Sequence, residues 1–362
     1  MDALPLPLAR RKPLAYCHLT PPFDRLVGRI PDDALNIPSM MADGEKEFLY
    51  GLAKDYYSGA GLIIDAGIFL GGSTVCMGSG LRLNPHLAAA VARFRQPIVS
   101  FELGITNRNM LLNFRRHGIA RDLRIGDSFK PVVEHLIAPV RDLVDLRIGN
   151  ILELGRIGLP GARVKTPVEI LFLDVLKSLE IGQFCLREYF TRLIPRRSIV
   201  IQQDYLNGDM PFIHHHQEFF ASKFEYIGEV SSSAIFRLVH RITPQEVEDF
   251  LGRPEDLEAN VTASAIAGQR SIDPHRRILV AFSTLRSILA ARGQRAAREY
   301  LAFIELEYAQ QLAQTHFRRV QNVIEACRYL CEHGLEGEAE AMQISTGHRG
   351  LDHRRTDLRQ AA

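Results

Sequence analysis

Carboxylates follow two of the short apolar runs in this chain. Asp174 directly follows the run at 170–173, and Asp204 lies shortly after the run at 199–201. Two carboxylates at the ends of adjacent strands can bind a divalent cation or serve as acid and base. Lys177 lies one helical turn after Asp174, where it can pair with that carboxylate or contact a substrate. Asp174, Asp204 and Lys177 are therefore the candidate catalytic residues, with helix capping by Asp174 as an alternative.

A glycine-rich turn follows the apolar run at 62–64. Residues 65–74 read DAGIFLGGST, so an acid and a glycine turn lead from a strand into a helix. Glycines let a backbone approach a ligand closely, and Ser73 or Thr74 can cap a helix whose first N–H groups face that ligand. The spacing is not that of the G-x-G-x-x-G turn that binds a pyrophosphate. The residues that we assign to this ligand loop are Asp65, Gly67, Phe69, Gly71, Gly72, Ser73 and Thr74.

Acidic or amide side chains also follow the second and third apolar runs. Glu102 follows the run at 98–101, where its carboxylate can accept hydrogen bonds from both hydroxyls of a ribose. Asn150 follows the run at 143–148, where an amide can hold the amino group of a base while Ile151 packs on the ring. A simple turn asparagine is an equally good interpretation of Asn150.

A parallel sheet would bring these side chains to one edge. Five apolar runs are separated by segments long enough for crossover helices, which predicts parallel strands. Only residues 231–233 separate the last two runs, so these predict an antiparallel hairpin. The fold class is therefore α/β, with a Rossmann-like sheet of seven strands that ends in a hairpin. The predicted strands contain residues 62–64, 98–101, 143–148, 170–173, 199–201, 224–230 and 234–239.

The elements divide the chain into four parts. The stretch 105–142 is long for one crossover, and it predicts an insertion with helices at 107–117 and near 130–138. A capping box at Thr243–Glu246 begins an all-helical pattern, which a linker at 252–272 interrupts. The predicted parts are an N-terminal arm at 1–38, a Rossmann-like domain at 39–242, a helical region at 243–334 and a disordered tail at 335–362.

The helical region contains a heptad pattern. Its apolar residues are spaced alternately by three and four, which predicts a helix over about 295–333 packed on a helix over 275–291, with Gly293 between them. The longer helix has more seam than the shorter one can cover, so we expect the rest to pack on the Rossmann-like domain, on a second copy of the chain or on a partner protein. The seam residues are Phe303, Leu306, Gln310, Ala313, Phe317, Val320, Ile324, Cys327 and Cys331.

Composition excludes several classes of protein. The formal net charge is +2, which gives no bulk electrostatic reason to expect a nucleic-acid partner. The sequence has five scattered cysteines, an N-terminus unlike a secretory signal and no apolar stretch of membrane-spanning length. We therefore expect a cytoplasmic protein without a disulfide framework and without a membrane partner. The run at 214–216 is three histidines, but consecutive helical residues point in different directions and cannot all bind one ion.

The motifs DAGIFLGGST, SFEL, RIGNI, EILFLD and SIVIQQDY stand in an order that resembles the class I S-adenosylmethionine-dependent methyltransferases over about 38–240. More narrowly, the chain resembles the macrocin O-methyltransferase type, which methylates sugar hydroxyls in natural products. The resemblance implies that the glycine loop binds S-adenosylmethionine and that Glu102 binds its ribose. It also implies that Asp174 and Asp204 match two aspartates that bind magnesium.

The chain departs from that family at three positions. Gln203 stands where the narrower group has a further aspartate, and Leu176 stands where it often has an acid proposed as the base. Asn150 stands where many methyltransferases have aspartate. Because two carboxylates hold magnesium only loosely, we expect weak metal dependence or none.

The expected function is transfer of a methyl group from S-adenosylmethionine to a small-molecule acceptor, such as a hydroxyl of a sugar or natural product. A non-catalytic binding protein that keeps the cofactor fold is the first alternative, and Gln203 and Leu176 favour it. A nicotinamide-dependent oxidoreductase is the second alternative, against which the glycine spacing and the terminal hairpin both argue.

Overall fold

The structure is a computed structural model that describes residues 17–119, 122–157, 166–314 and 318–347. Within these residues the chain forms two compact units. The first unit extends to Tyr205 and resumes over His216–Pro254. The second unit contains Leu206–His215 and resumes at Glu255.

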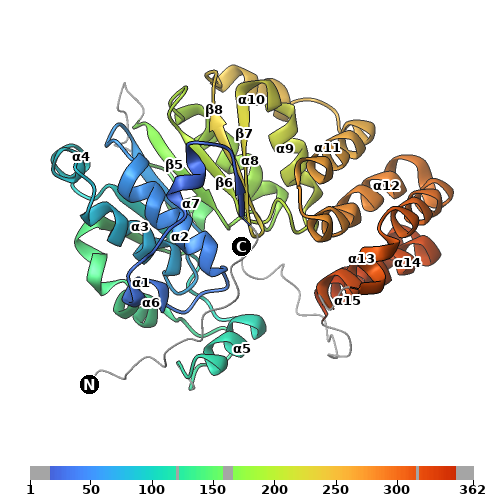
Figure 1. The fold of residues 1–362 in the computed structure, drawn as a ribbon, viewed down its shortest axis with the longest axis horizontal. Coiled ribbons are helices and arrows are strands. Elements are labelled where there is room, and N and C mark those ends of the chain that lie inside the picture. Colours follow the sequence, from blue (N-terminus) through green and yellow to red (C-terminus); the bar gives the residue numbers. More distant parts are fainter. Residues whose placement is uncertain (1–16, 120–121, 158–165, 315–317, 348–362) are drawn as a thin grey trace. The chain divides into compact units, whose positions relative to one another are not determined.

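The first unit is built on one mixed sheet of eight strands (Figure 1). The strand order is β1-β7-β8-β6-β5-β2-β3-β4, and the five strands from β6 to β4 are parallel to one another. Chain order reverses where β2 lies beside β5, which makes that pair the topological switch point of the sheet. The strands are β1 (Cys17–Leu19), β2 (Leu62–Ala66), β3 (Ile98–Glu102), β4 (Val144–Ile148), β5 (Val168–Leu173), β6 (Ile199–Gln202), β7 (Phe224–Val230) and β8 (Ser233–Leu238).

The eighth strand comes from the region predicted to be an arm. β1 pairs antiparallel with β7, and Cys17 lies opposite Val230. Without β1, β7 would present a row of unpaired backbone groups at the sheet edge. The approach is close, because a Cβ on Gly228 would lie 2.1 Å from the carbonyl oxygen of His18. The predicted count of seven strands is therefore wrong by this edge strand, which is too short and polar to show as an apolar run.

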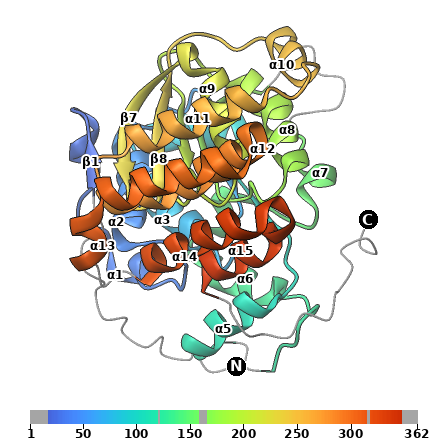
Figure 2. The ribbon, with the colours of Figure 1, turned by 90° about the vertical axis from the view of Figure 1, so that its right-hand side faces the viewer.

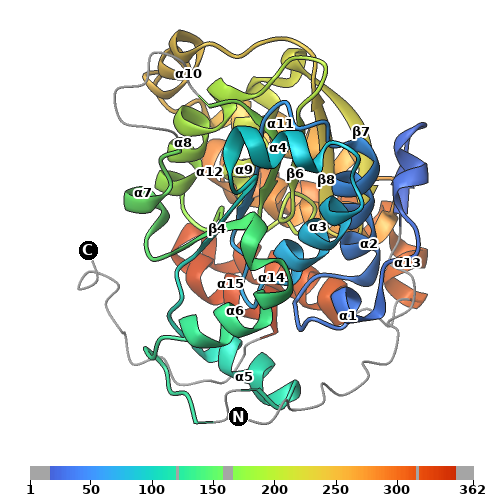
Figure 3. The same cartoon turned by 90° about the vertical axis from the view of Figure 1, so that its left-hand side faces the viewer.

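Helices accompany the strands of the first unit, and α2 and α3 lie side by side against the sheet (Figure 1). The insertion between β3 and β4 holds α5 and α6, close to the two helices predicted there (Figure 3). The capping box at Thr243 and Glu246 is confirmed at the start of α10. The helices up to this point are α1 (Asp32–Leu35), α2 (Asp43–Gly51), α3 (Gly72–Arg82), α4 (Leu87–Phe94), α5 (Arg108–Arg116), α6 (Lys130–Leu136), α7 (Ile151–Leu154), α8 (Leu179–Glu188), α9 (Pro211–Phe219) and α10 (Pro244–Leu251).

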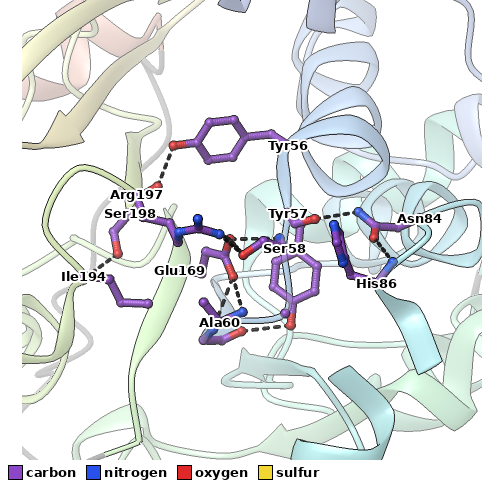
Figure 4. A network of polar contacts seen from close by, with 12 residues as sticks. Tyr56, Tyr57, Ser58, Ala60, Asn84, His86, Glu169, Ile194, Arg197 and Ser198 are labelled. Atoms are coloured by element: carbon purple, nitrogen blue, oxygen red, sulfur yellow. Dashed lines mark hydrogen bonds and ion pairs between the residues drawn. The ribbon is translucent and has the colours of Figure 1, made fainter. Parts of the chain in front are cut away.

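A buried glutamate organises the edge of the sheet where the parallel strands begin (Figure 4). The Glu169 carboxylate accepts hydrogen bonds from the backbone and hydroxyl of Ser58, at 2.9 and 2.8 Å, and from the backbone N–H of Ala60 at 2.8 Å. Arg197 lies 3.7 Å away from the same carboxylate. These contacts fix the turn that leads into β2. They lie at the opposite ends of the strands from Asp174, so we assign them to stability.

The second unit is helical, and the predictions of a linker and of one long helix are wrong. A helix occupies the predicted linker, because Asp256 caps it and Val261 packs into the apolar core of this unit. The predicted long helix stops at Glu307, and a separate helix, α14, packs on α12 (Figure 2). The helices are α11 (Leu257–Arg270), α12 (Pro274–Glu307), α13 (Ala309–Gln314), α14 (Arg318–His333) and α15 (Glu338–Thr346).

The heptad seam is not one continuous surface. Phe303 is 55% exposed and Leu306 is 80% exposed, whereas Val320 and Ile324 are buried in the core of the second unit. Gly293 does interrupt the pattern as expected, with φ 81° and ψ −178° inside α12. The seam position Phe317 lies outside the described residues.

The predicted tail is ordered in its first part. α15 covers residues that the sequence assigned to disorder, because Ala341 and Ile344 are buried in the same core. The remainder of that prediction, at 348–362, lies outside the described residues. Within the described ranges, no helix is both long and apolar enough to cross a membrane.

Candidate functional site

The glycine loop crosses the end of β5 at the switch point of the sheet. Gly67 has a positive φ of 94°, and a Cβ there would lie 2.5 Å from the carbonyl oxygen of Asp174. Gly71 also has a positive φ, of 86°, and a Cβ there would lie 2.4 Å from Cγ2 of Ile137. Both glycines are therefore required by neighbouring parts of the chain. They bring the β2–α3 loop to the place where ligands bind in open α/β sheets.

Asp65 holds the loop together from inside. Its carboxylate accepts hydrogen bonds from the Ser73 hydroxyl at 3.0 Å and from the Thr74 hydroxyl at 2.6 Å. Burial raises the pKa of Asp65 to about 7, although the two hydroxyls act against this shift. The expectation that Ser73 or Thr74 caps α3 is wrong, because the N-cap is Gly71 and both hydroxyls serve Asp65 instead. The loop therefore offers a ligand its backbone rather than these three side chains.

Phe69 connects the loop to the insertion. The residue has a positive φ of 51°, and its ring stacks on Phe114 of α5 with the ring centres 5.5 Å apart. Phe129, just before α6, meets the same ring edge-on at 6.2 Å. Neither partner was among the predicted site residues. The apolar face of the helix predicted at 107–117 could have indicated Phe114, but not what it packs against.

Glu102 ties the end of β3 to this loop. One carboxylate oxygen accepts a 2.6 Å hydrogen bond from the backbone N–H of Phe69, and the other accepts from Gly104 at 3.2 Å. Burial raises the pKa of Glu102, and these backbone donors act against the shift. Leu103, the next residue, has an apolar side chain that is 57% exposed. Sequence reasoning missed Leu103, although its position directly after a strand-end acid was the available signal.

Asn150 and Ile151 lie at the end of β4. The side-chain oxygen of Asn150 accepts a 3.0 Å hydrogen bond from the backbone N–H of Leu152, so this residue caps the short helix α7. The side chain of Ile151 is buried under other parts of the chain. The capping role expected of a turn asparagine is therefore present, and the apolar side chain exposed nearby is Leu154.

The candidate catalytic residues Asp174, Lys177 and Asp204 are in direct contact. The ammonium of Lys177 lies 2.9 Å from Asp174 Oδ1 and forms a second ion pair with Asp204 Oδ2. Gln203 is oriented with its amide nitrogen toward the carboxylates, because the opposite orientation would set oxygen against oxygen. Its amide donates to Asp174 Oδ1 at 3.1 Å and to Asp204 Oδ1 at 3.0 Å. The ends of β5 and β6 thus hold one ammonium and one amide between two carboxylates.

Electrostatics fix the charge of this cluster. Burial raises the pKa of Asp174 to about 7, the ammonium of Lys177 opposes that rise, and the charge of Asp204 adds to it. Burial would lower the pKa of Lys177, but the attraction of Asp174 and Asp204 outweighs it and the pKa is raised. Lys177 therefore stays cationic at neutral pH and cannot act as a base.

Magnesium does not fit these residues. The described residues contain no group of three or more histidine, cysteine, aspartate or glutamate side chains arranged to hold a metal ion. A cation that bridged Asp174 and Asp204 would need the place that the ammonium of Lys177 takes. Gln203 adds a neutral amide where a third carboxylate would be needed to strengthen such a site.

A second buried acid lies behind the cluster. Glu45 of α2 is buried, and one of its oxygens accepts hydrogen bonds from the hydroxyls of Ser232 and Ser233, at 3.2 and 2.7 Å. Its other oxygen accepts from the backbone N–H of Ala42 at 2.8 Å. The Gln203 side chain lies 3.4 Å from the Ser232 hydroxyl, so Glu45 and the cluster are neighbours. Sequence reasoning did not find Glu45, because nothing in the pattern of α2 indicates a partner in the β7–β8 turn.

Two members of the histidine run contact different parts of the chain. His214 lies 3.3 Å from the Ser264 hydroxyl, and the ring of His216 packs edge-on against Phe250 at 5.5 Å.

No family model matches the chain, and none of the curated proteins is found to be similar to it. The residues of the candidate site therefore provide the evidence for its function.

Proposed function

We propose that the first unit is a methyltransferase that uses S-adenosylmethionine and methylates a hydroxyl group of a small molecule, such as a sugar or another natural product. The observation that carries the proposal is the glycine loop, which crosses the end of β5 at the switch point while Glu102 holds it from β3. The antiparallel neighbours β7 and β8 add support, because most dinucleotide-binding Rossmann domains lack such a final hairpin.

The residues present fit an adenosine-containing ligand. The Glu102 carboxylate interacts with the backbone N–H groups of Phe69, Gly104 and Leu103, whereas an ionised carboxylate has about four acceptor positions. The acceptor capacity that remains suits a ribose hydroxyl. Leu103 gives an exposed apolar surface for a base, and the first turn of α3 supplies N–H groups without intrahelical partners. The opposite end of the site, at Asp174 and Asp204, then faces the reacting groups.

In this proposal the chain aligns the acceptor hydroxyl with the methyl donor and removes one proton from the hydroxyl. S-adenosylmethionine supplies, when bound, a methyl group already activated by a sulfonium. Asp204 would accept the proton of the acceptor hydroxyl while the hydroxyl oxygen takes the methyl group and the demethylated sulfur compound leaves. Asp174 is the second carboxylate and keeps Lys177 in place. The aspartate side chains are 16% exposed, so the proton can pass on to solvent.

Differential stabilisation tests the cofactor assignment. A ligand that binds only the folded chain raises the free energy of unfolding by RT ln(1 + [L]/Kd), and the melting temperature rises with it. We expect S-adenosylmethionine and S-adenosylhomocysteine to raise the melting temperature of the full chain at millimolar concentration, and NAD⁺ and NADP⁺ to leave it unchanged. A rise with the nicotinamide cofactors alone would replace this proposal with an oxidoreductase.

A further inference from the structure

We propose that the ammonium of Lys177 is a built-in replacement for a divalent cation, which holds the acceptor hydroxyl at Asp174 and Asp204 and makes methyl transfer independent of metal. The acceptor role rests on the proposed function, whereas the exclusion of metal is a property of the cluster alone. Three observations support it, concerning position, occupancy and charge.

The position is that of a strand-end cation site. Asp174 directly follows β5 and Asp204 follows β6, and these parallel strands are neighbours in the sheet. Their carboxylates therefore converge at the edge where ligands bind. Lys177 reaches both of them from the segment between β5 and α8, and its side chain is 53% exposed. The ammonium is thus anchored by two carboxylates, while part of the Lys177 side chain stays exposed.

The carboxylate oxygens of Asp174 and Asp204 already have partners, which leaves no place for a second cation. The ammonium pairs with Asp174 Oδ1 and with Asp204 Oδ2, and the Gln203 amide donates to Asp174 Oδ1 and Asp204 Oδ1. A metal ion would have to displace both the ammonium and these amide N–H groups. A lysine ammonium has three N–H donors, and the two carboxylates engage two of them. The third suits the oxygen of an acceptor hydroxyl.

The single positive charge of the Lys177 ammonium limits its effect on the acceptor hydroxyl. An ammonium carries one positive charge, so it positions the acceptor oxygen but lowers its pKa less than a divalent ion would. The acceptor proton must therefore move to a carboxylate, and Asp204 is next to the ammonium. Lys177 is a cation by its ordinary chemistry, and its ammonium pairs with both carboxylates. Metal-free transfer by this cluster thus needs both the lysine and the aspartates.

Binding of Mn²⁺ to the full chain tests the exclusion without cofactor or acceptor. Mn²⁺ would be titrated into wild type, Lys177→Ala and Lys177→Arg, with the free ion followed by electron paramagnetic resonance. We expect Lys177→Ala to bind one Mn²⁺ at least tenfold more tightly than wild type, because it leaves two adjacent carboxylates without their cation. Lys177→Arg keeps a cation in place and should exclude Mn²⁺ as wild type does. The double variant Lys177→Ala/Asp204→Asn should lose the acquired site.

The contrary results are equally definite. Wild type that binds Mn²⁺ as tightly as Lys177→Ala would overturn the inference, as would a folded Lys177→Ala that gains no affinity. If Lys177→Ala does not fold alone, refolding with Mn²⁺ supports the inference and failure with and without Mn²⁺ contradicts it. None of these outcomes depends on S-adenosylmethionine, so a failed cofactor assignment and a failed cation replacement are distinguishable.

Discussion

The carboxylate of Glu102 accepts a 2.6 Å hydrogen bond from the backbone N–H of Phe69, and this contact joins the ends of two neighbouring strands. Phe69 in turn stacks on Phe114 of the insertion. The acid at the end of β3 is therefore a support of the glycine loop as well as a candidate ligand residue. Substitutions at Glu102 should change both the conformation of the loop and its affinity for a ligand.

Asp65 should make the stability of the chain fall as pH rises toward neutrality. Its pKa is raised to about 7, so the folded chain holds this proton over a range in which an unfolded aspartate, with a pKa near 4, has lost it. The folded state binds more protons between about pH 4 and 7, and unfolding free energy decreases across that window. Asp65→Asn cannot titrate, and its amide can still bond to the Ser73 and Thr74 hydroxyls.

Urea denaturation of both proteins at several pH values between 4 and 8 checks this. We expect the decrease in unfolding free energy with rising pH to be smaller in Asp65→Asn than in wild type. Asp174 and Glu102 also have raised pKa values, so part of the decrease should remain in the variant. An equal pH dependence in the two proteins would show that Asp65 is not the buried proton holder described above.

Glu169 should be a major stabilising residue that has no part in catalysis. It is fully buried and accepts hydrogen bonds from Ser58, Ala60 and Gly61. Glu169→Ala leaves those donors without their acceptor and should lower the free energy of unfolding by about 3 kcal/mol. Chemical denaturation measures the change.

Glu225 provides the matched control for Glu169. It also lies in a strand of the first unit and pairs with an arginine, Arg237, but both side chains are partly exposed. Glu225→Ala should therefore lower stability by less than about 1 kcal/mol. Equal losses in the two variants would argue against a special role for the buried network.

Glycine-to-alanine substitutions should have opposite effects at two positions of the second unit. Gly293 adopts φ 81° and ψ −178°, a conformation almost restricted to glycine, and Gly293→Ala should destabilise by about 2 kcal/mol although the space around it is open. Gly268 lies within α11, where a Cβ would meet Cγ1 of Val280 at an ordinary 3.6 Å. Gly268→Ala should stabilise by up to about 1 kcal/mol. Thermal melts of the two variants give the signs, and the same sign for both would contradict the break in α12.

Much of the first unit could be predicted from sequence because its strands are apolar runs bounded by polar residues. The run at 170–173 and the acid after it are local features, so Asp174 falls where it was expected. The meeting of Asp174, Lys177 and Asp204 followed from the parallel order of strands. The sequence did not show which of several possible hydrogen-bond partners a side chain takes in the fold. Ser73 and Thr74 suit a helix cap as well as a buried acid, and only the position of Asp65 decides between them.

The second unit shows where a periodic pattern misleads. Residues from Phe303 to Cys331 keep a heptad spacing, but spacing alone does not require that a helix continue. At Tyr308 the backbone leaves the helical conformation, with φ −109° and ψ 21°, and the later seam residues pack on α12 instead. Conversely, residues 257–270 lie in the predicted linker and residues 338–346 in the predicted tail, yet a few of their side chains complete the core. Tertiary packing determines both outcomes.

Calorimetric titration of S-adenosylhomocysteine into wild type, Glu102→Gln and Glu102→Ala tests whether Glu102 and the glycine loop bind the methyl donor. Glu299→Ala, an exposed substitution in the second unit, serves as the control. We predict one bound ligand per wild-type chain, equal binding by Glu299→Ala, and at least tenfold weaker binding by Glu102→Ala, with Glu102→Gln between them because it keeps one acceptor oxygen. Absence of binding to the folded wild type, or binding that Glu102→Ala leaves unchanged, would contradict the account.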